Sequence, residues 1–287
     1  MSEQPMDGWF TEVFDQQGSA IALRVTEKLL DVTSPYQHLE VFETETHGRL
    51  MVLDGCVMLT DRDNFLYHEM MSHPVLFTHA APKRVVIIGG GDCGTLREVL
   101  KHPGVEKVTQ IDIDEEVTRA AERFFPTLVE RNDDPRAELL FEDGVKWVDN
   151  CPDESIDVMI IDSTDPVGPA EGLFKTDFLT RCHRILAPGG VMVQQSESPL
   201  YHTGTIIREL RRDMRAAGFD SVATLPFPQP TYPSGWWSCT LAGKGCDTAT
   251  FRSNDADSAD LALEYYSSAL HQGALVLPPF MRRQLVE

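Results

Sequence analysis

The order of apolar and polar positions divides the chain into two parts with different textures. From Ser19 to about Met58, short β-rich runs alternate with turn residues such as Ser34-Pro35 and His47-Gly48. The runs SAIALRV, HLEVFET and RLMVLDG predict strands, and the turns between them favour antiparallel pairing. We therefore expect a small N-terminal antiparallel β domain over residues 1–65.

A repeated pattern of strand, loop and helix follows residues 64–82, which predict a helix that ends near Pro82. Continuous apolar runs predict buried strands, and the amphipathic segments between them predict helices. The predicted strands are RVVIIG (84–89), KVTQIDI (107–113), AELLF (137–141), IDVMIID (156–162) and VMVQQ (191–195). The predicted helices are TLREVLKH, EEVTRAAERFF, GVKWVDN, KTDFLTRCHRIL, which Pro188-Gly189-Gly190 would end, and a longer TGTIIRELRRDMRAAG.

This alternation predicts a parallel sheet covered by helices on both faces, which is the doubly wound α/β class with a Rossmann-like, methyltransferase-like sheet. Residues 66–287 are expected to form this second domain. The runs SVATLPF and WWSCTLAG predict further strands of the sheet. The tail from Asp247 is first polar and then apolar again, so a C-terminal extension is expected to pack back on the sheet after a linker.

Charge narrows the classes of partner. The 287 residues include 45 Asp and Glu but only 25 Lys and Arg, a formal net charge of −20. Such a surface disfavours nucleic acid and anionic membranes, because affinity for phosphates comes mainly from Lys and Arg. It favours a cationic ligand, or it serves solubility alone.

Neither export nor a metal framework is expected from the sequence. The N-terminus lacks the basic and apolar regions of a signal peptide, and no apolar run approaches the roughly 18 residues of a membrane span, so we expect a cytoplasmic protein. Six cysteines without a C-x-x-C pair favour reduced thiols. HEMMSH at 68–73 spaces its histidines five apart, so they do not share a helical face and predict no zinc site.

A glycine turn, GGGDCG at 89–94, follows the first predicted parallel strand and opens a helix. Such a turn lets a ligand approach the backbone, although a glycine turn alone is weak evidence for any ligand. The carboxylate of Asp92 would repel the phosphates of a dinucleotide. The turn is therefore better suited to a cationic group.

Aspartates stand at or just after the ends of four successive predicted strands: Asp92, Asp112, Asp143 and Asp162. A single aspartate in such a place is usually a helix cap or turn residue. Four of them at the carboxyl ends of parallel strands, where ligands bind in open α/β sheets, indicate a site for a ribose and positive charge. An S-adenosyl sulfonium compound fits, and Asp92 favours a decarboxylated tail that ends in an ammonium over one with an α-carboxylate.

Several longer motifs occur in a fixed order along the chain: GGGDCGTLREVLKH, QIDID, EDGVKWV, DSTDPVGPAEGLF, QQSESP and PTYPSG, with SPYQHLEVFETETHGRLMVLDG and DRDNFLYHEM before them. In order and spacing they resemble the motifs of the spermidine synthases, the polyamine aminopropyltransferases. The resemblance runs from about Trp9 to Lys244. It implies transfer of the aminopropyl group of decarboxylated S-adenosylmethionine to putrescine with release of 5′-methylthioadenosine, by a homodimer or homotetramer that needs no cofactor or metal.

The resemblance also assigns roles to residues. Asp162 would be the base or the carboxylate that holds the attacking amine, and Tyr67 would orient the same nitrogen. Asp165 and Tyr232 would hold the amine substrate. For the donor, Asp92 would bind the aminopropyl ammonium, Asp112 the ribose, Asp143 with Gly144 the adenine, Gln37 the nucleoside side and His68 the amino tail.

Departures from the family pattern leave the amine open. Cys93 and Met58 stand where many members have Gly and Gln, and Gln229 and Trp236 flank the PTYPSG motif beside the expected amine pocket. Spermidine, cadaverine, diaminopropane and agmatine are alternative acceptors. A noncatalytic polyamine-binding protein is a further alternative, whereas a methyltransferase is disfavoured by Asp92 and a nicotinamide oxidoreductase by the phosphate argument.

Overall fold

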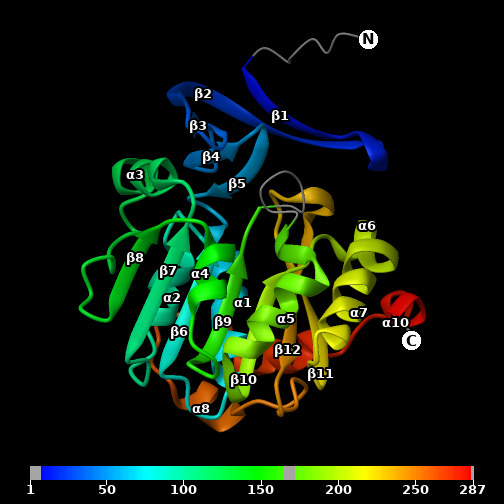
Figure 1. Ribbon diagram of the computed structural model, residues 1–287. Coiled ribbons are helices and arrows are strands. Elements are labelled where there is room, and N and C mark those ends of the chain that lie inside the picture. The colour runs from blue at the N-terminus through cyan, green and yellow to red at the C-terminus, as the bar shows by residue number, and fades with distance from the viewer. Residues whose placement is uncertain (1–7, 165–171, 286–287) are drawn as a thin grey trace.

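The computed structural model of the protein describes residues 8–164 and 172–285. Its N-terminal part is a five-stranded antiparallel sheet in which each strand pairs with the next along the chain (Figure 1). The strands are β1 (Trp9–Phe14), β2 (Ser19–Thr33), β3 (His38–Thr44), β4 (Arg49–Leu53) and β5 (Cys56–Thr60). The antiparallel sheet is as predicted, but the sequence analysis missed β1 and β5.

A seven-stranded sheet forms the larger part, in the order β11-β12-β10-β9-β6-β7-β8. Its strands are β6 (Arg84–Gly89), β7 (Lys107–Asp112), β8 (Ala137–Phe141), β9 (Ile156–Asp162), β10 (Leu186–Gln195), β11 (Ser221–Pro228) and β12 (Trp236–Gly243). The five strands β6 to β10 pair in parallel, whereas β12 runs antiparallel to β10 and to β11. The predicted doubly wound α/β class is confirmed, with an antiparallel hairpin at one edge.

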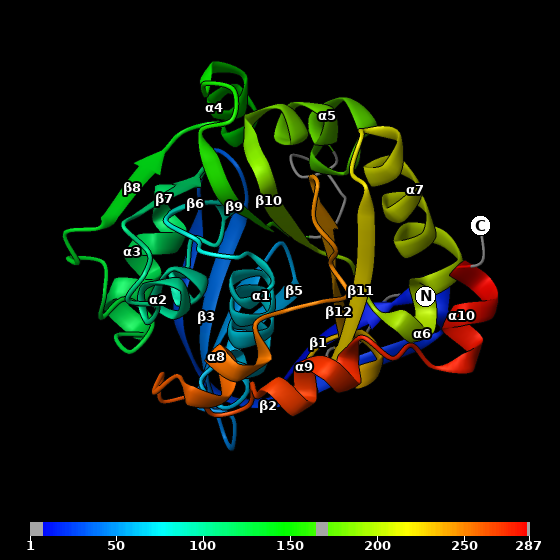
Figure 2. The same cartoon turned by 90° about the horizontal axis from the view of Figure 1, so that it is seen from below.

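Helices cover both faces of the large sheet (Figure 2). One apolar cluster joins the sheet to α1 (Asn64–Thr78), α2 (Gly94–Leu100) and the C-terminal tail. A second cluster joins the opposite face to α4 (Gly144–Asn150), α5 (Thr176–Ile185) and α7 (Arg208–Ala216). Helix α3 (Glu115–Phe124) packs instead against β3 and β4, so it connects the two sheets.

Three predicted helix boundaries were wrong. Helix α1 ends at Thr78 rather than near Pro82. Helix α5 ends at Ile185, and Pro188-Gly189-Gly190 lies inside β10, where the register with β9 shifts between Leu186 and Val191. Such a bulge tolerates Pro and Gly within a strand. The helix predicted over TGTIIRELRRDMRAAG begins with a π-helical turn (Thr203–Ile207) after the short α6 (Pro199–His202), and only then continues as α7.

The C-terminal tail packs back on the large sheet, as predicted. It contains α8 (Ser253–Ser258), α9 (Ser268–Ala274) and α10 (Pro279–Leu285). Leu261 and Tyr266 of the tail join the core cluster on the α1 face. The buried carboxylate of Glu69 in α1 accepts hydrogen bonds from three successive backbone amides, Glu264, Tyr265 and Tyr266, at 2.8, 2.9 and 2.6 Å. Glu69 of the HEMMSH segment is thus an anchor for the tail.

Helix α1 contains Pro74, which removes one backbone donor from the helix interior. The carbonyl of Met70, four residues earlier, is the group that this donor would have served. The thiol of Cys239 in β12 lies 3.5 Å from that carbonyl and donates to it. This contact compensates for the proline and attaches α1 to the sheet.

The carboxylate of Asp63, just before α1, connects the small sheet to a loop of the large domain. Asp63 is buried and accepts hydrogen bonds from the hydroxyl of Thr60, at the end of β5, and from the hydroxyl of Thr231, at 2.5 and 2.7 Å. The loop that carries Thr231 joins β11 to β12 and also carries Tyr232. Asp63 therefore fixes this loop against the start of α1.

Replacing Asp63 by Ala should lower the free energy of unfolding by about 1 to 3 kcal/mol, because it leaves two buried hydroxyl donors without their acceptor. Urea denaturation measures the loss. Asp153→Ala is the control, since Asp153 is an exposed partner of Arg184 and should matter less. Equal losses in the two variants would contradict the role of Asp63.

Candidate active site

A cavity of about 410 Å³ opens at the carboxyl ends of β6, β7, β8 and β9, beneath the small sheet. Nine of the ten predicted site residues line it; the tenth, Asp165, lies outside the described residues. The nine are Gln37, Tyr67, His68, Asp92, Asp112, Asp143, Gly144, Asp162 and Tyr232. The structure therefore brings together residues from both sheets and from α1. Trp236, expected beside the amine pocket, packs instead against Phe280, with ring centroids 6.0 Å apart.

The glycine turn after β6 crosses the end of β9 at close range. Gly89 and Gly90 have φ angles of +85° and +69°, and the amide of Gly90 donates to the carbonyl of Asp162 at 2.8 Å. A Cβ atom on Gly89 would lie 2.1 Å from that carbonyl oxygen, and one on Gly94 would lie 2.2 Å from the His68 ring. The positive φ angles favour glycine at positions 89 and 90, and the close approaches leave no room for a side chain at positions 89 and 94.

Cys93 occupies the turn with a φ angle of +68°, and its side chain points into the core. Its sulfur lies 3.5 Å from the amide nitrogen of Gln110 and 3.4 Å from that of Asn132. Burial raises the pKa of the thiol to about 12. Cys93 is not among the residues that line the cavity, so its departure from Gly leaves the ligand-facing surface of the turn unchanged.

The carboxylate of Asp162 is held at both oxygens. Its Oδ1 accepts from the hydroxyl of Tyr67 at 2.7 Å, and its Oδ2 accepts from the hydroxyl of Thr95 at 2.6 Å. Burial, with a further contribution from the negative charge of Asp92, raises the pKa of Asp162 above its ordinary value. This fixed carboxylate is thus a stronger base than an exposed aspartate. The sequence analysis missed Thr95, because nothing in the sequence distinguishes it from another threonine in a first helical turn.

The buried His68 pairs with the partly exposed Asp92, with 3.2 Å between His68 Nε2 and Asp92 Oδ1. The amide of Gly94 also donates to this carboxylate at 2.6 Å. Burial opposes the charge on both partners, but their attraction outweighs it, which raises the pKa of His68 and lowers the pKa of Asp92. A cationic ligand at Asp92 would meet an ionised carboxylate.

Asp114 ties the loop that carries Gln37 to the site. Its Oδ2 accepts from the hydroxyl of Ser34 at 2.7 Å and from the amide of Gln37 at 2.8 Å. The backbone amide of Asp114 in turn donates to Asp112 at 2.8 Å. Burial raises the pKa of Asp112 to about 6. Asp114 is a positioning residue to which the sequence analysis gave no role.

Asp143 lines the cavity and also caps α4. Its carboxylate accepts from the backbone amides of Val145 and Lys146 at 2.9 and 3.4 Å. A Cβ atom on Gly144 would lie 2.6 Å from the Ile88 side chain, so glycine lets α4 start against β6. Asp143 therefore both caps a helix, as an aspartate after a strand usually does, and faces the ligand cavity.

A small chamber of about 30 Å³ adjoins the main cavity and shares Met58, Tyr67 and Tyr232 with it. The rings of Tyr67 and Tyr232 lie 5.8 Å apart, and the hydroxyl of Tyr232 donates to the carbonyl of Met58. Glu12 and Trp237 line the chamber. Glu12 is buried, and its Oε2 accepts from the amide of Val57 at 2.8 Å. The sequence analysis missed Glu12 because it missed β1.

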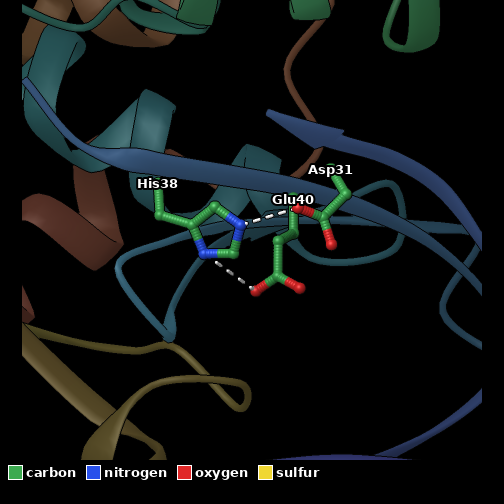
Figure 3. Close-up of side chains that lie close together, drawn as sticks. All are labelled: Asp31, His38 and Glu40. Atoms are coloured by element: carbon green, nitrogen blue, oxygen red, sulfur yellow. Dashed lines mark hydrogen bonds and ion pairs between the residues drawn. The ribbon is translucent and has the colours of Figure 1, made fainter. Parts of the chain in front are cut away.

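Three potential metal ligands gather away from the cavity, on β2 and β3 (Figure 3). They are Asp31, His38 and Glu40, and they form the one such group found in residues 8–164 and 172–285. The ammonium of Lys28 lies 2.7 Å from both carboxylates, and His38 Nε2 lies 2.8 Å from Asp31. The cluster is therefore already an ion-pair network, with Lys28 as its cation.

Comparison with known proteins identifies the family. Residues 64–253 match the family described as "Spermine/spermidine synthase domain", and residues 8–61 match "Spermidine synthase tetramerisation domain". The chain belongs to the spermine/spermidine synthase family. The predicted family and the enzyme class, a spermidine synthase-type aminopropyltransferase, are thereby confirmed.

Relatives in the family are similar over nearly their whole length. The chain is 59% identical to the polyamine aminopropyltransferase of Alkalilimnicola ehrlichii over 281 residues, which is 98% of each chain. It is 57% identical to that of Methylococcus capsulatus over 279 residues, 97% of each. A spermidine synthase crystallised with the transition-state analogue AdoDATO superposes with a TM-score of 0.93 at 34% identity, over 99% of this chain and 96% of the other.

The spermidine synthase of Thermotoga maritima superposes with a TM-score of 0.90 at 35% identity, over 96% of this chain and 94% of the other.

Within the described residues, every helix is too short or too polar to cross a membrane.

Replacing Asp112 by Asn should stabilise the ligand-free enzyme above pH 7. The pKa of about 6 exceeds the ordinary value of about 3.9, so the folded state is most favoured at low pH and loses this advantage as the pH rises through 6. The gain should be about 3 kcal/mol near neutral pH and should shrink toward pH 4. Calorimetric unfolding from pH 4 to 8 measures it.

Asp143→Asn is the matched control, because it changes a helix-cap carboxylate of the same cavity and a cap tolerates either residue. A gain for Asp112→Asn that does not depend on pH would contradict the explanation.

Proposed function

We propose that the enzyme transfers the aminopropyl group of decarboxylated S-adenosylmethionine to putrescine, which yields spermidine and 5′-methylthioadenosine. The observation that carries the proposal is the carboxylate of Asp162, fixed by Tyr67 and Thr95 at 2.7 and 2.6 Å in a cavity that also contains Asp92. The names of the relatives and of the solved spermidine synthases support it.

The donor would lie along the ends of β6, β7 and β8. Asp112 would accept from the ribose hydroxyls, and Asp143 with Gly144 would contact the adenine. Gln37, oriented by Asp114, would close the nucleoside side. The ionised Asp92, beside His68, would bind the ammonium of the aminopropyl tail, whereas it would repel the α-carboxylate of S-adenosylmethionine itself.

Asp162 would activate the acceptor. A primary amine with a pKa near 10.4 is neutral in only about 1 molecule in 2,500 at pH 7, so its proton must be removed before it can attack. Asp162 accepts this proton, and Tyr67 orients the nitrogen. The new bond forms between nitrogen and the carbon next to sulfur, while the bond from that carbon to sulfur breaks and its electron pair neutralises the sulfonium.

The second ammonium of putrescine would lie toward the small chamber. Tyr67 and Tyr232 line both the chamber and the main cavity, and the buried Glu12 lines the chamber. A carboxylate there favours an acceptor with a second positive charge. Asp165, outside the described residues, is proposed as a further ligand of this amine.

The displacement moves no electrons to or from an external carrier, so the proposed reaction requires no cofactor, and the donor is a co-substrate.

We also propose a homotetramer assembled through residues 8–61, as the description of the matching family segment suggests. Trp9 and Val13 expose apolar side chains on β1, at 38% and 43%, which is compatible with a covered surface.

The activity is tested by incubating the enzyme with decarboxylated S-adenosylmethionine and putrescine and measuring methylthioadenosine. Asp162→Asn should lower kcat about a hundredfold to ten-thousandfold, because it removes the base. Asp157→Asn is the matched control: Asp157 lies at the opposite end of β9 and pairs with Arg84 at 2.6 Å. Its activity should be unchanged.

Two results would contradict this proposal. An active Asp162→Asn enzyme would remove Asp162 from the role of base. Binding of putrescine without release of methylthioadenosine from any of putrescine, cadaverine, diaminopropane, agmatine or spermidine would instead support a noncatalytic polyamine-binding protein.

The acceptor assignment is tested with putrescine and n-butylamine, which has the same chain length but no second ammonium. Glu12→Gln keeps an acceptor for the amide of Val57 and removes the charge. It should raise the KM for putrescine about tenfold and leave that for n-butylamine unchanged. Equal effects on the two amines would show that Glu12 does not bind the second ammonium.

A further inference from the structure

The side-chain oxygen of Gln229, in the wall of the main cavity, has no hydrogen-bond partner among the described residues. Gln229 is 1% exposed and lines the cavity with Tyr67 and Tyr232. Within residues 8–164 and 172–285, its amide oxygen accepts no hydrogen bond. A buried acceptor without a donor is costly, so such a group at a ligand site indicates that a ligand supplies the donor.

The backbone around Gln229 is fixed. Its amide donates to the carbonyl of Gly235 at 3.0 Å, and its carbonyl accepts from the amide of Tyr232 at 3.0 Å. The neighbouring Thr231 binds Asp63 at the start of α1. The side-chain amide is therefore held in the wall by a rigid loop, which favours specific recognition over a loose contact.

The chemistry of the surrounding wall limits what Gln229 can recognise. Asp92 and Asp162 already place two carboxylates in the cavity, and the charge of Asp92 contributes to the raised pKa of Asp162. A neutral amide adds an acceptor without adding to this repulsion. Met58, whose side chain lines the same cavity, offers only a weakly accepting thioether.

We propose that the side-chain oxygen of Gln229 accepts a hydrogen bond from an alkylammonium group bound in this cavity, and that Gln229 is a specificity-determining residue for it. The inference rests on the proposed function, which provides two sources of this group: the aminopropyl tail of the donor and the acceptor diamine. Gln229 discriminates in favour of ligands that carry the ammonium and against analogues without it.

Calorimetric titration of wild type and Gln229→Met tests the proposal without turnover, since Met keeps the volume and removes the amide. The ligands are decarboxylated S-adenosylmethionine, methylthioadenosine, which lacks the aminopropyl tail, and putrescine added to the enzyme bound to methylthioadenosine. The Kd for one of the two ammonium ligands should rise about tenfold, and that for methylthioadenosine should not change. A rise for the decarboxylated donor assigns Gln229 to the tail, and a rise for putrescine assigns it to the acceptor.

Gln229→Glu and Gln194→Met complete the test. Glu keeps acceptor oxygens and loses the amide donor, so it should retain binding of the ammonium ligand. Gln194 is also buried with an unpartnered amide oxygen within the described residues, but it does not line the cavity, so Gln194→Met should bind all ligands as wild type does.

Unchanged Kd values in Gln229→Met, weak binding in Gln229→Glu, or an equal loss in Gln194→Met would overturn the proposal. Failure of the proposed function is a separate result, namely no methylthioadenosine released by the wild-type enzyme.

Discussion

Repulsion among carboxylates gathered at the ends of four neighbouring parallel strands, seen where Asp92 raises the pKa of Asp162, is the constraint that the rest of the site must satisfy. Each carboxylate is stabilised by neutral donors or, for Asp92, by the ring of His68, and no lysine or arginine of the described residues lines the cavity. The partners are the hydroxyls of Tyr67 and Thr95 for Asp162, the ring of His68 for Asp92, the amide of Asp114 for Asp112 and the start of α4 for Asp143. Within the described residues His68 is the one potential cation in the lining, so most of the negative charge is held in place without being cancelled, and a cationic ligand would complete the balance.

The same contacts that hold the fold together also enclose the site. A small antiparallel sheet is weak on its own, and here it buries an apolar face on α3, where β3 and β4 meet Val117 and Phe124. The loop that carries Gln37, between β2 and β3, reaches the cavity through Asp114, at the start of the same helix. The link from Asp63 to Thr231 closes the opposite side. Loss of sheet packing would thus open the ligand cavity as well.

Much of this architecture could be predicted from the sequence where burial is complete. Strands such as β6 and β9 are apolar on both faces, so their continuous apolar runs predict buried parallel strands. The carboxyl ends of such strands necessarily meet at one edge of the sheet. The strand β1 was missed because it is mostly exposed and turns Glu12 inward, which reverses the usual pattern. The π-helical turn before α7 leaves no pattern in the sequence either. Thr95 and Asp114 bind side chains that are distant in the sequence, Asp162 and Gln37, and the local sequence does not predict such contacts.

The inward orientation of Cys93 bears on a side reaction, the alkylation of its thiol by the donor. A sulfonium donor of the kind proposed above is an alkylating agent, and a thiolate is a better nucleophile toward it than an amine. The left-handed turn directs this sulfur away from the ligand side, and burial keeps it protonated, with a pKa of about 12. The thiol within the glycine turn is thus kept from competing with the substrate for the donor.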